Sequence, residues 1–309
     1  MDRSEAEQAV TKILTFADID DKPPEEKKRP EVMDLDPTLW DGVAPKDREF
    51  LIDGWLPSGC VTLLSGDGGI GKSLVAMQAA TAVATGTPFL GLKTTKAPVL
   101  AIYAEDDPDE LHRRQLSICD AFEISMKDLG GMRLAGRVGE NNVIARADHN
   151  ASYVQAEDLW VSIANRAVEM GARLVILDNI AQMFAGNEVN RTEVTQFVAL
   201  CARLAKQING AVLLLGHVGK GETAKEYSGS TAWNASVRSR WLLERPEVAD
   251  DDEANECLRI LTKKKANYSS TGDSIALEWQ RGAFHLHGYQ GDNFVDRMEK
   301  RNREKAAEK

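Results

Sequence analysis

One short stretch limits the possible folds of this chain more than any other feature. Gly66-Asp67-Gly68-Gly69-Ile70-Gly71-Lys72-Ser73 has the spacing G-x-x-x-x-G-K-S, and it follows the aliphatic run Val61–Leu64. The residues after it have helical periodicity. A pattern of this kind between a strand and a helix predicts a loop whose backbone N–H groups surround a phosphate, with the helix dipole adding to the attraction. The sequence therefore predicts an α/β fold built around a phosphate-binding loop.

The motif also predicts roles for the side chains of the loop. Lys72 is expected to reach the β- and γ-phosphate oxygens and to take part in catalysis, and the Ser73 hydroxyl is expected to ligate Mg²⁺. The residues predicted to contact the nucleotide are Gly66, Gly68, Gly69, Ile70, Gly71, Lys72, Ser73 and Leu74. ATP and Mg²⁺ are therefore the expected cofactors.

Apolar runs alternate with helical segments from about residue 50 onward. The runs are Cys60–Leu64, Val99–Tyr103, Leu174–Leu177 and Ala211–Leu215. Helical patterns lie between them at residues 73–85, 108–122, 154–170 and 191–208. Near-continuous aliphatic runs are typical of strands buried on both faces of a parallel sheet. The alternation predicts a mostly parallel, doubly wound sheet with its site at the carboxyl ends of the strands.

After Arg238 the apolar runs are separated by turns and not by helices. They lie at Ser239–Leu243, Cys257–Thr262, Ile275–Gln280 and Ala283–His287. Short turns favour antiparallel pairing, so we expect these strands to extend the same sheet. We divide the chain into a flexible acidic arm (1–48) with a short amphipathic helix, an ATPase domain (49–290) and a charged tail (291–309). The helix of the arm either docks on a neighbouring subunit or folds back on its own core.

Composition narrows the class of protein further. The chain has 309 residues and a formal net charge of −10, which argues against a protein that coats DNA nonspecifically but leaves room for a local basic channel. No stretch approaches the roughly 18 uninterrupted apolar residues of a membrane span, and the acidic N-terminus is unlike a secretory signal. We expect a cytoplasmic protein that does not insert in membranes. The four cysteines form no C-x-x-C pair and are expected to be free thiols.

Two carboxylates follow apolar runs at the predicted site. Asp178 comes directly after Leu174–Leu177, where an acid is expected to orient the magnesium ion through a water. Glu105 follows the run that ends at Tyr103, and hydrolysis of ATP needs a general base that faces the γ-phosphate across one water. We predict Glu105 as that base, with the adjacent Asp106 as the competing candidate.

The residues after Asp106 have a structural reading of their own. Asp107 is predicted to be the N-cap of the next helix, with Pro108 at its first position and Glu110 at its third. This assignment leaves Glu105 available for chemistry.

The ordered set of motifs resembles the RecA-like P-loop ATPases of the AAA family, and most closely the RepA-type hexameric plasmid replicative DNA helicases. The resemblance covers about Leu51 to Leu286. Beyond the loop, it is carried by Leu56-Pro57-Ser58-Gly59, Tyr103-Ala104-Glu105-Asp106-Asp107-Pro108, Leu177-Asp178-Asn179, Gly216-His217, Gly229-Ser230, Ser239-Arg240-Trp241 and Lys265-Ala266-Asn267-Tyr268.

The resemblance implies further roles. It makes Glu105 the catalytic base, Asp178 the magnesium-orienting acid and His217 the sensor of the γ-phosphate. It makes Arg240 an arginine finger that acts on a neighbouring subunit, with Arg238 as one alternative and a plain surface arginine as the other. Self-association into a ring, expected to be a hexamer, follows from this.

Two further elements are candidates for contacts with partners. Lys263 and Lys265 could reach across the interface between subunits, and a solvated lysine run is the alternative. Residues 217–229 contain two lysines and Tyr227, a composition that could neutralise and stack on single-stranded DNA. Neighbouring glutamates weaken that reading, and a loop without a ligand is the alternative.

These observations leave several functions open. The first is a ring-forming helicase or translocase of a plasmid, phage or integrated element. The second is an accessory ATPase of recombination or repair, and the third is a nucleotide-gated switch that binds a protein partner without DNA. A P-loop kinase is a weaker fourth, for which Arg113-Arg114 is the nearby arginine pair.

Overall fold

The computed structural model describes residues 34–148, 153–217, 231–246 and 255–287. The predicted helix of the arm, the candidate DNA loop after His217 and the C-terminal tail lie outside these residues. Within the described parts of the chain, no helix combines the length and the apolar character needed to cross a membrane.

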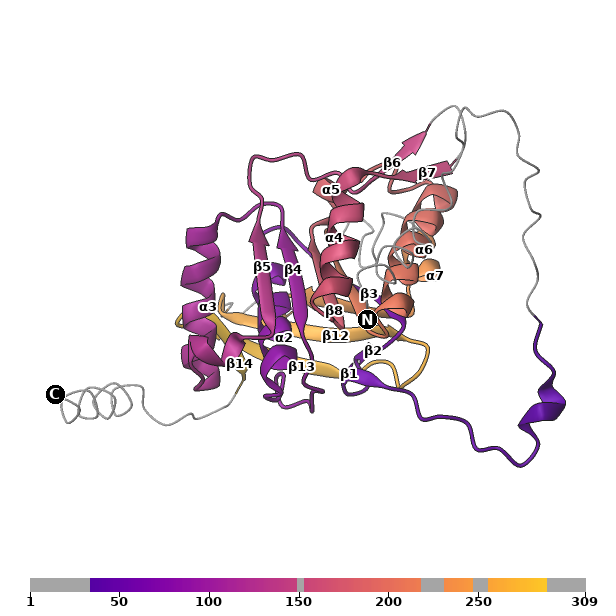
Figure 1. The fold of residues 1–309 in the computed structure, drawn as a ribbon. Helices are drawn as coiled ribbons and strands as arrows, with labels where there is room; N and C mark the ends of the chain where they lie inside the picture. The colour runs from indigo at the N-terminus through magenta and orange to yellow at the C-terminus, as the bar shows by residue number, and fades with distance from the viewer. Residues whose placement is uncertain (1–33, 149–152, 218–230, 247–254, 288–309) are drawn as a thin grey trace.

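A nine-stranded sheet forms the centre of the molecule, with the order β14-β13-β12-β11-β3-β10-β8-β4-β5 (Figure 1). In chain order, its strands are β3 (Cys60–Gly66), β4 (Val99–Tyr103), β5 (Met132–Gly136), β8 (Leu174–Asp178), β10 (Ala211–His217), β11 (Ser239–Glu244), β12 (Leu258–Ala266), β13 (Ser274–Gln280) and β14 (Ala283–Leu286). Every neighbouring pair from β11 to β5 is parallel. The predicted class, a mostly parallel sheet with added antiparallel strands, is confirmed.

The register of the parallel strands determines where the site lies. Gly66 is paired with His217, and both Leu215 and Tyr103 are paired with Asp178. The carboxyl ends of β3, β10, β8 and β4 therefore lie next to one another at one edge of the sheet. Side chains that follow these strands are brought to the same place.

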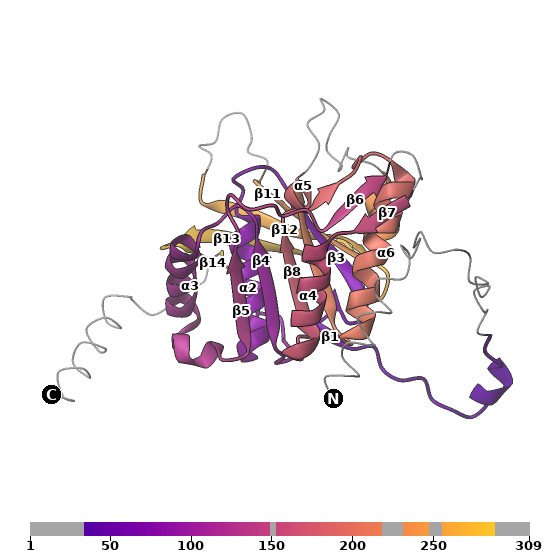
Figure 2. The ribbon, with the colours of Figure 1, turned by 45° about the horizontal axis from the view of Figure 1, so that its top comes forward.

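Helices cover both faces of this sheet (Figure 2). α2 (Lys72–Thr85) and α3 (Pro108–Phe122) pack with Leu64 on one face, and α4 (Asp158–Glu169) and α6 (Arg191–Gln207) pack with Leu63 on the other. Successive strand residues thus enter two different cores. Because both cores are apolar, the strands have continuous aliphatic sequences without alternation.

Smaller elements complete the fold. They are η1 (Pro37–Trp40), β1 (Phe50–Ile52), β2 (Leu56–Pro57), η2 (Met126–Leu129), β6 (Ala145–Asp148), β7 (Tyr153–Ala156), α5 (Ile180–Met183), β9 (Phe184–Ala185) and α7 (Thr231–Ser236). β7, β6 and β9 form a separate three-stranded sheet. The helix expected over 154–170 begins only at Asp158, because the residues before it pair with β6 as β7.

The C-terminal strands differ from the expectation in one respect. β12, β13 and β14 are antiparallel, as predicted, but β11 is parallel to β3. The reason is α7, which packs against α6 between β10 and β11 and makes the connection a crossover. Figure 1 shows β12 and β13 running across the view, steeply inclined to β4 and β5.

The first described residues lie apart from the sheet, with η1 well away from the body of the molecule (Figure 1), whereas Glu49, directly before β1, forms an ion pair with Arg173. Leu35, Leu39, Trp40 and Val43 are all exposed there, Trp40 by 58%. The side chain of Asp36 caps η1 by accepting a hydrogen bond from the Thr38 N–H.

Candidate functional site

The phosphate-binding loop joins the end of β3 to the start of α2. Gly69 and Gly71 have φ values of 70° and 107°, which favour glycine. A Cβ atom at Gly71 would lie 2.7 Å from the Phe284 ring, and one at Gly66 would lie 2.5 Å from the Leu243 carbonyl oxygen. Backbone conformation therefore favours glycine at position 69, close packing requires it at position 66, and both reasons apply at Gly71.

Lys72 is the first residue of α2, where the loop ends, and is only 6% exposed. Its Nζ donates hydrogen bonds to the carbonyl oxygens of Gly66 at 3.0 Å and Asp67 at 2.8 Å. Burial lowers the pKa of Lys72, and the nearby Asp178, Asp67 and Glu105 carboxylates oppose this shift. The ammonium group is held by carbonyls that phosphate oxygens can replace, because all of these groups are acceptors.

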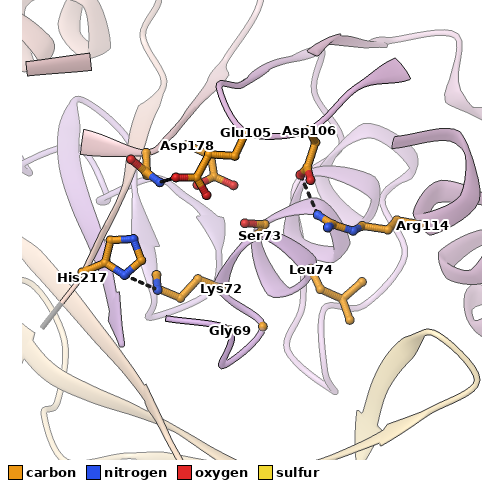
Figure 3. A pocket seen from close by; sticks show the side chains of 11 residues that line it. Gly69, Lys72, Ser73, Leu74, Glu105, Asp106, Arg114, Asp178 and His217 are labelled. Carbon is orange, nitrogen blue, oxygen red and sulfur yellow. Dashed lines mark hydrogen bonds and ion pairs between the residues drawn. The ribbon is translucent and has the colours of Figure 1, made fainter. Parts of the chain in front are cut away.

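His217 contacts the same ammonium group. Its Nδ1 lies 3.2 Å from Lys72 Nζ, so the imidazole accepts from the ammonium through an unprotonated Nδ1 (Figure 3). Burial lowers the pKa of His217, and the positive charge of Lys72 lowers it further. The structure thus places the predicted sensor beside the predicted phosphate-binding lysine.

Asp178 and Ser73, the predicted magnesium ligands, lie together. Asp178 is 6% exposed, and its burial raises its pKa to about 6, although a hydrogen bond with the Ser73 side chain and the charge of Lys72 oppose this. A buried carboxylate with a raised pKa next to a hydroxyl fits a divalent cation, which would supply the missing positive charge. Within the described residues there is no cluster of three or more His, Cys, Asp or Glu side chains suited to a metal ion.

Glu105 extends from the end of β4 toward the pocket. Its Oε1 accepts a hydrogen bond of 2.7 Å from Nδ2 of Asn179. Asn179 follows Asp178 through a cis peptide bond, and the carbonyl of Asp178 accepts a hydrogen bond from the Ala104 N–H. The ends of β4 and β8 are thus joined directly beneath the predicted base.

Asp106, the competing base candidate, is held in an ion pair. Its Oδ2 lies 2.6 Å from Nη1 of Arg114, whose Nε also contacts Glu110 at 2.9 Å. Burial raises the pKa of Asp106, and Arg114 opposes that shift. The Asp107 side chain accepts a hydrogen bond from the Glu110 N–H, so the predicted N-cap of α3 is confirmed.

These side chains line one pocket with a volume of ≈ 330 Å³ (Figure 3). Its lining residues are Gly69, Gly71, Lys72, Ser73, Leu74, Glu105, Asp106, Arg114, Asp178, Asn179 and His217. The predicted contact residue Ile70 is placed differently. Its side chain is buried in the core with α2, and its carbonyl accepts a hydrogen bond of 3.0 Å from Nε of Arg259.

Arg240 is not among the residues that line this pocket in the described part of the chain. It lies half-buried on β11, paired with Leu63 of β3 and with Lys265 of β12. Burial lowers the pKa of Lys265, and the charges of Arg238 and Arg240 lower it further, so the three cations lie close together. We call Arg238, Arg240 and Lys265 the cationic group.

Lys263 is separated from this group. It is 2% exposed, and its Nζ contacts the Gly54 carbonyl at 3.0 Å and Asp273 at 2.7 Å in its own chain. It also lies over the Trp55 ring, 5.3 Å from the centroid. The expectation that Lys263 reaches a second subunit does not fit this geometry, because its side chain is enclosed and bonded within its own subunit.

A bulge in β12 explains the difference between the two lysines. Arg240 is opposite Lys265, but the next residue of β11, Trp241, is opposite Lys263. Neighbouring residues of a strand point to opposite faces, so Lys265 and Lys263 do too. Spacing alone would have placed both lysines on one face.

Sequence reasoning gave Arg114 a role only in the kinase alternative, named Asn179 only within a motif of the resemblance without a role, and missed Arg259. Arg114 lies four residues after Glu110 on a predicted helix, a spacing that signals an ion pair. The contacts of Asn179 and Arg259 depend on strands that are distant in sequence, and the sequence contains no comparable signal for them.

Comparison with known families agrees with this arrangement. A family model described as an AAA domain matches residues 26–223, which is more than half of the chain. The match includes the phosphate-binding loop and the strands that carry Glu105, Asp178 and His217. The chain therefore belongs to the AAA-domain family of P-loop ATPases.

Proposed function

We propose that this protein is an ATP-hydrolysing motor with a RecA-like core, which forms a ring and translocates on single-stranded DNA. The observation that supports hydrolysis best is the position of three side chains around the phosphate-binding loop. Glu105 follows β4, whereas Asp178 and His217 are the last residues of β8 and β10. All three line one pocket with Lys72. This arrangement provides a base, a metal ligand and a phosphate contact in one site.

The proposed reaction is an in-line attack of water on the γ-phosphorus of ATP. Glu105 takes the proton of the attacking water, a P–O bond forms to that water, and the bond to the β-phosphate oxygen breaks. Lys72 and the N–H groups of the loop bind the phosphates, and Ser73 with Asp178 would hold Mg²⁺, which neutralises the developing charge. His217 contacts the γ-phosphate and Lys72, so it can sense whether the phosphate is present.

The cationic group supports assembly into a ring. Among the described residues, Arg240 is absent from the pocket of its own chain, yet it lies on a strand next to β3 with two other cations nearby. Such a group suits a phosphate anion supplied from outside the subunit, either the γ-phosphate in a neighbouring site or the DNA backbone. We propose Arg240 as the residue that acts on the neighbouring site and Lys265 as its companion. Lys263 is not included.

The exposed apolar segment before β1 is consistent with this assembly. Leu35, Leu39, Trp40 and Val43 lie within a few residues of each other and face solvent. We propose that this segment docks on a second copy of the chain.

Two other functions share the same ATPase core. An accessory ATPase of recombination or repair would differ in assembly, which electron microscopy distinguishes as filaments or rings. A switch that binds a protein partner without DNA is favoured by the formal charge of −10. A kinase receives less support, because Arg113 and Arg114 contact Glu110, and Arg114 also contacts Asp106.

The first experiment is steady-state ATP hydrolysis at low salt, with and without single-stranded DNA. Strong stimulation by DNA, lost in Lys72→Ala, supports the translocase and justifies an unwinding assay. Hydrolysis that needs Lys72 but does not respond to DNA favours the switch. No hydrolysis by the wild-type protein under either condition contradicts the proposed motor.

A further inference from the structure

The carboxamide of Asn179 connects the predicted base to the backbone of α5. Its Nδ2 donates to Glu105 Oε1 at 2.7 Å, and its Oδ1 accepts a hydrogen bond from the Gln182 N–H at 3.2 Å. A carboxylate only accepts and an N–H only donates, so the carboxamide satisfies both partners in one orientation alone. Asn179 is 2% exposed, which keeps water from competing for these bonds.

This contact matters because Glu105 is otherwise an exposed side chain at the end of a strand. A free glutamate samples several rotamers, and only some of them direct an oxygen toward the attacking water. Anchoring Oε1 to a buried amide restricts this sampling and leaves the other oxygen available to the pocket that Glu105 lines.

Asn179 also connects Glu105 to the packed elements α5, β9, α6 and α7. α5 is followed at once by β9, where Phe184 stacks on Phe197 of α6 with ring centroids 4.6 Å apart. The Phe197 ring is 6.0 Å from Trp233 of α7, and Trp233 Nε1 donates to the Glu188 carbonyl at 3.0 Å. The segment that holds Glu105 is therefore packed against α6 and α7.

We propose that Asn179 is a positioning residue for hydrolysis, which orients Glu105 toward the attacking water and makes that orientation depend on the position of α5. This inference rests on the proposed function, in which Glu105 is the general base. A displacement of α5 withdraws the amide and slows hydrolysis, so a ligand or partner that moves α5 controls the rate without touching the nucleotide. α7 precedes β11, which carries Arg240. A movement at the proposed subunit interface could therefore reach Glu105 of the same subunit through α7, α6 and α5.

The variant that tests this is Asn179→Ser in the full-length protein. Serine keeps an oxygen that can cap α5, but it is too short to reach Glu105. We expect kcat for ATP to fall on the order of tenfold while KM stays close to that of the wild type, because the phosphate-binding loop and the predicted magnesium ligands are unchanged. Thermal melting is measured in parallel. If the serine variant does not fold, Asn179→Asp replaces it, since Asp has the same size and keeps the cap acceptor but cannot donate from that position.

A double-mutant cycle separates positioning from a general structural role. In a Glu105→Gln background, the Asn179 substitution is expected to cause no further loss of single-turnover hydrolysis, because the group that it orients is already gone. An equal loss in both backgrounds, or an unchanged kcat in the single variant, overturns the inference. The wild-type control keeps the two proposals apart. If the wild-type protein does not hydrolyse ATP, the proposed function fails, whereas a wild-type rate matched by the serine variant contradicts only the role of Asn179.

Discussion

Lys72 and His217 are 145 residues apart in the sequence, and their side-chain nitrogens meet 3.2 Å apart at the phosphate-binding loop. The contact exists because β3 and β10 are neighbours and are paired residue for residue to their ends. It places a neutral acceptor on the ammonium group that is expected to bind the γ-phosphate.

Removing this acceptor should affect turnover more than binding. In His217→Ala, Lys72 keeps its contacts with the loop carbonyls, so we expect the Kd for ATP to change by less than about threefold and kcat to fall by roughly tenfold or more. Fluorescent nucleotide titration and steady-state hydrolysis measure the two quantities. Lys72→Ala is the control, in which binding itself should weaken. A large loss of affinity in the histidine variant would show that His217 supports binding rather than sensing.

Glu105→Gln should abolish steady-state turnover, leaving only a residual rate in single-turnover experiments, while the protein still binds ATP. The amide cannot accept the proton of water, and general bases typically contribute about 10²- to 10⁴-fold in rate. Asp106→Asn is the matched control, because Asp106 lies in an ion pair with Arg114 and should contribute less to turnover. If the Asp106 variant loses more activity than the Glu105 variant, the assignment of the base must be reversed.

Asp178 should make the nucleotide-free protein less stable as pH rises. Its pKa is raised from 3.8 to about 6, so between these values the folded chain binds more protons than the unfolded chain. The free energy of unfolding therefore decreases as pH rises through this window, and the loss amounts to roughly 3 kcal/mol above it.

The variant Asp178→Asn removes this cost. We expect it to melt at a higher temperature than the wild type at pH 8 in EDTA without nucleotide, and the difference should shrink toward pH 5. The same variant should lose Mg²⁺-dependent hydrolysis. A variant that melts below the wild type at pH 8 would falsify the view that the buried anion is the source of the cost.

Arg240→Ala should lose hydrolysis only in the assembled protein, if the arginine acts on a neighbouring subunit. Mixing it with Lys72→Ala chains should restore part of the activity, because a mixed interface can contain both an intact pocket and an intact arginine. Hydrolysis is measured across mixing ratios, and Arg238→Ala, at the alternative finger candidate just before β11, is measured in parallel to compare the two arginines. Absence of recovery at every ratio would count against action between subunits.

The parts of the fold that were predictable are those in which one physical cause dominates. Val99–Tyr103 and Leu174–Asp178 are buried on both faces, so their composition alone identifies them as strands. The loop at Gly71 was recognisable because close approach and positive φ leave glycine as the only choice. The positions of Glu105, Asp178 and His217 then followed from the rule that parallel strands end at the same edge.

Strand direction, the face on which a side chain lies and the partner of a hydrogen bond were not predictable, because they depend on contacts between segments that are distant in sequence. The direction of β11 depends on α7, a helix too short to give a clear periodic pattern. The opposite faces of Lys263 and Lys265 depend on a bulge, which shifts the register by one residue. The bond between Asn179 and Glu105 joins two strand ends, and nothing in either local sequence identifies the other as its partner.

The contact between Arg259 and the Ile70 carbonyl has a consequence for how such a chain can be divided. Arg259 on β12 and Phe284 on β14 both press on the phosphate-binding loop, and β11 is hydrogen-bonded along β3. Arg259, Phe284 and β11 all come after residue 223, where the family match ends. A fragment that ends at residue 223 would keep the predicted site residues from Lys72 to His217. It would lose Arg259, Phe284 and β11, which pack against the phosphate-binding loop and β3. The segment that the family model matches is therefore shorter than the segment that encloses the phosphate-binding loop, and we expect only the longer segment to bind a nucleotide.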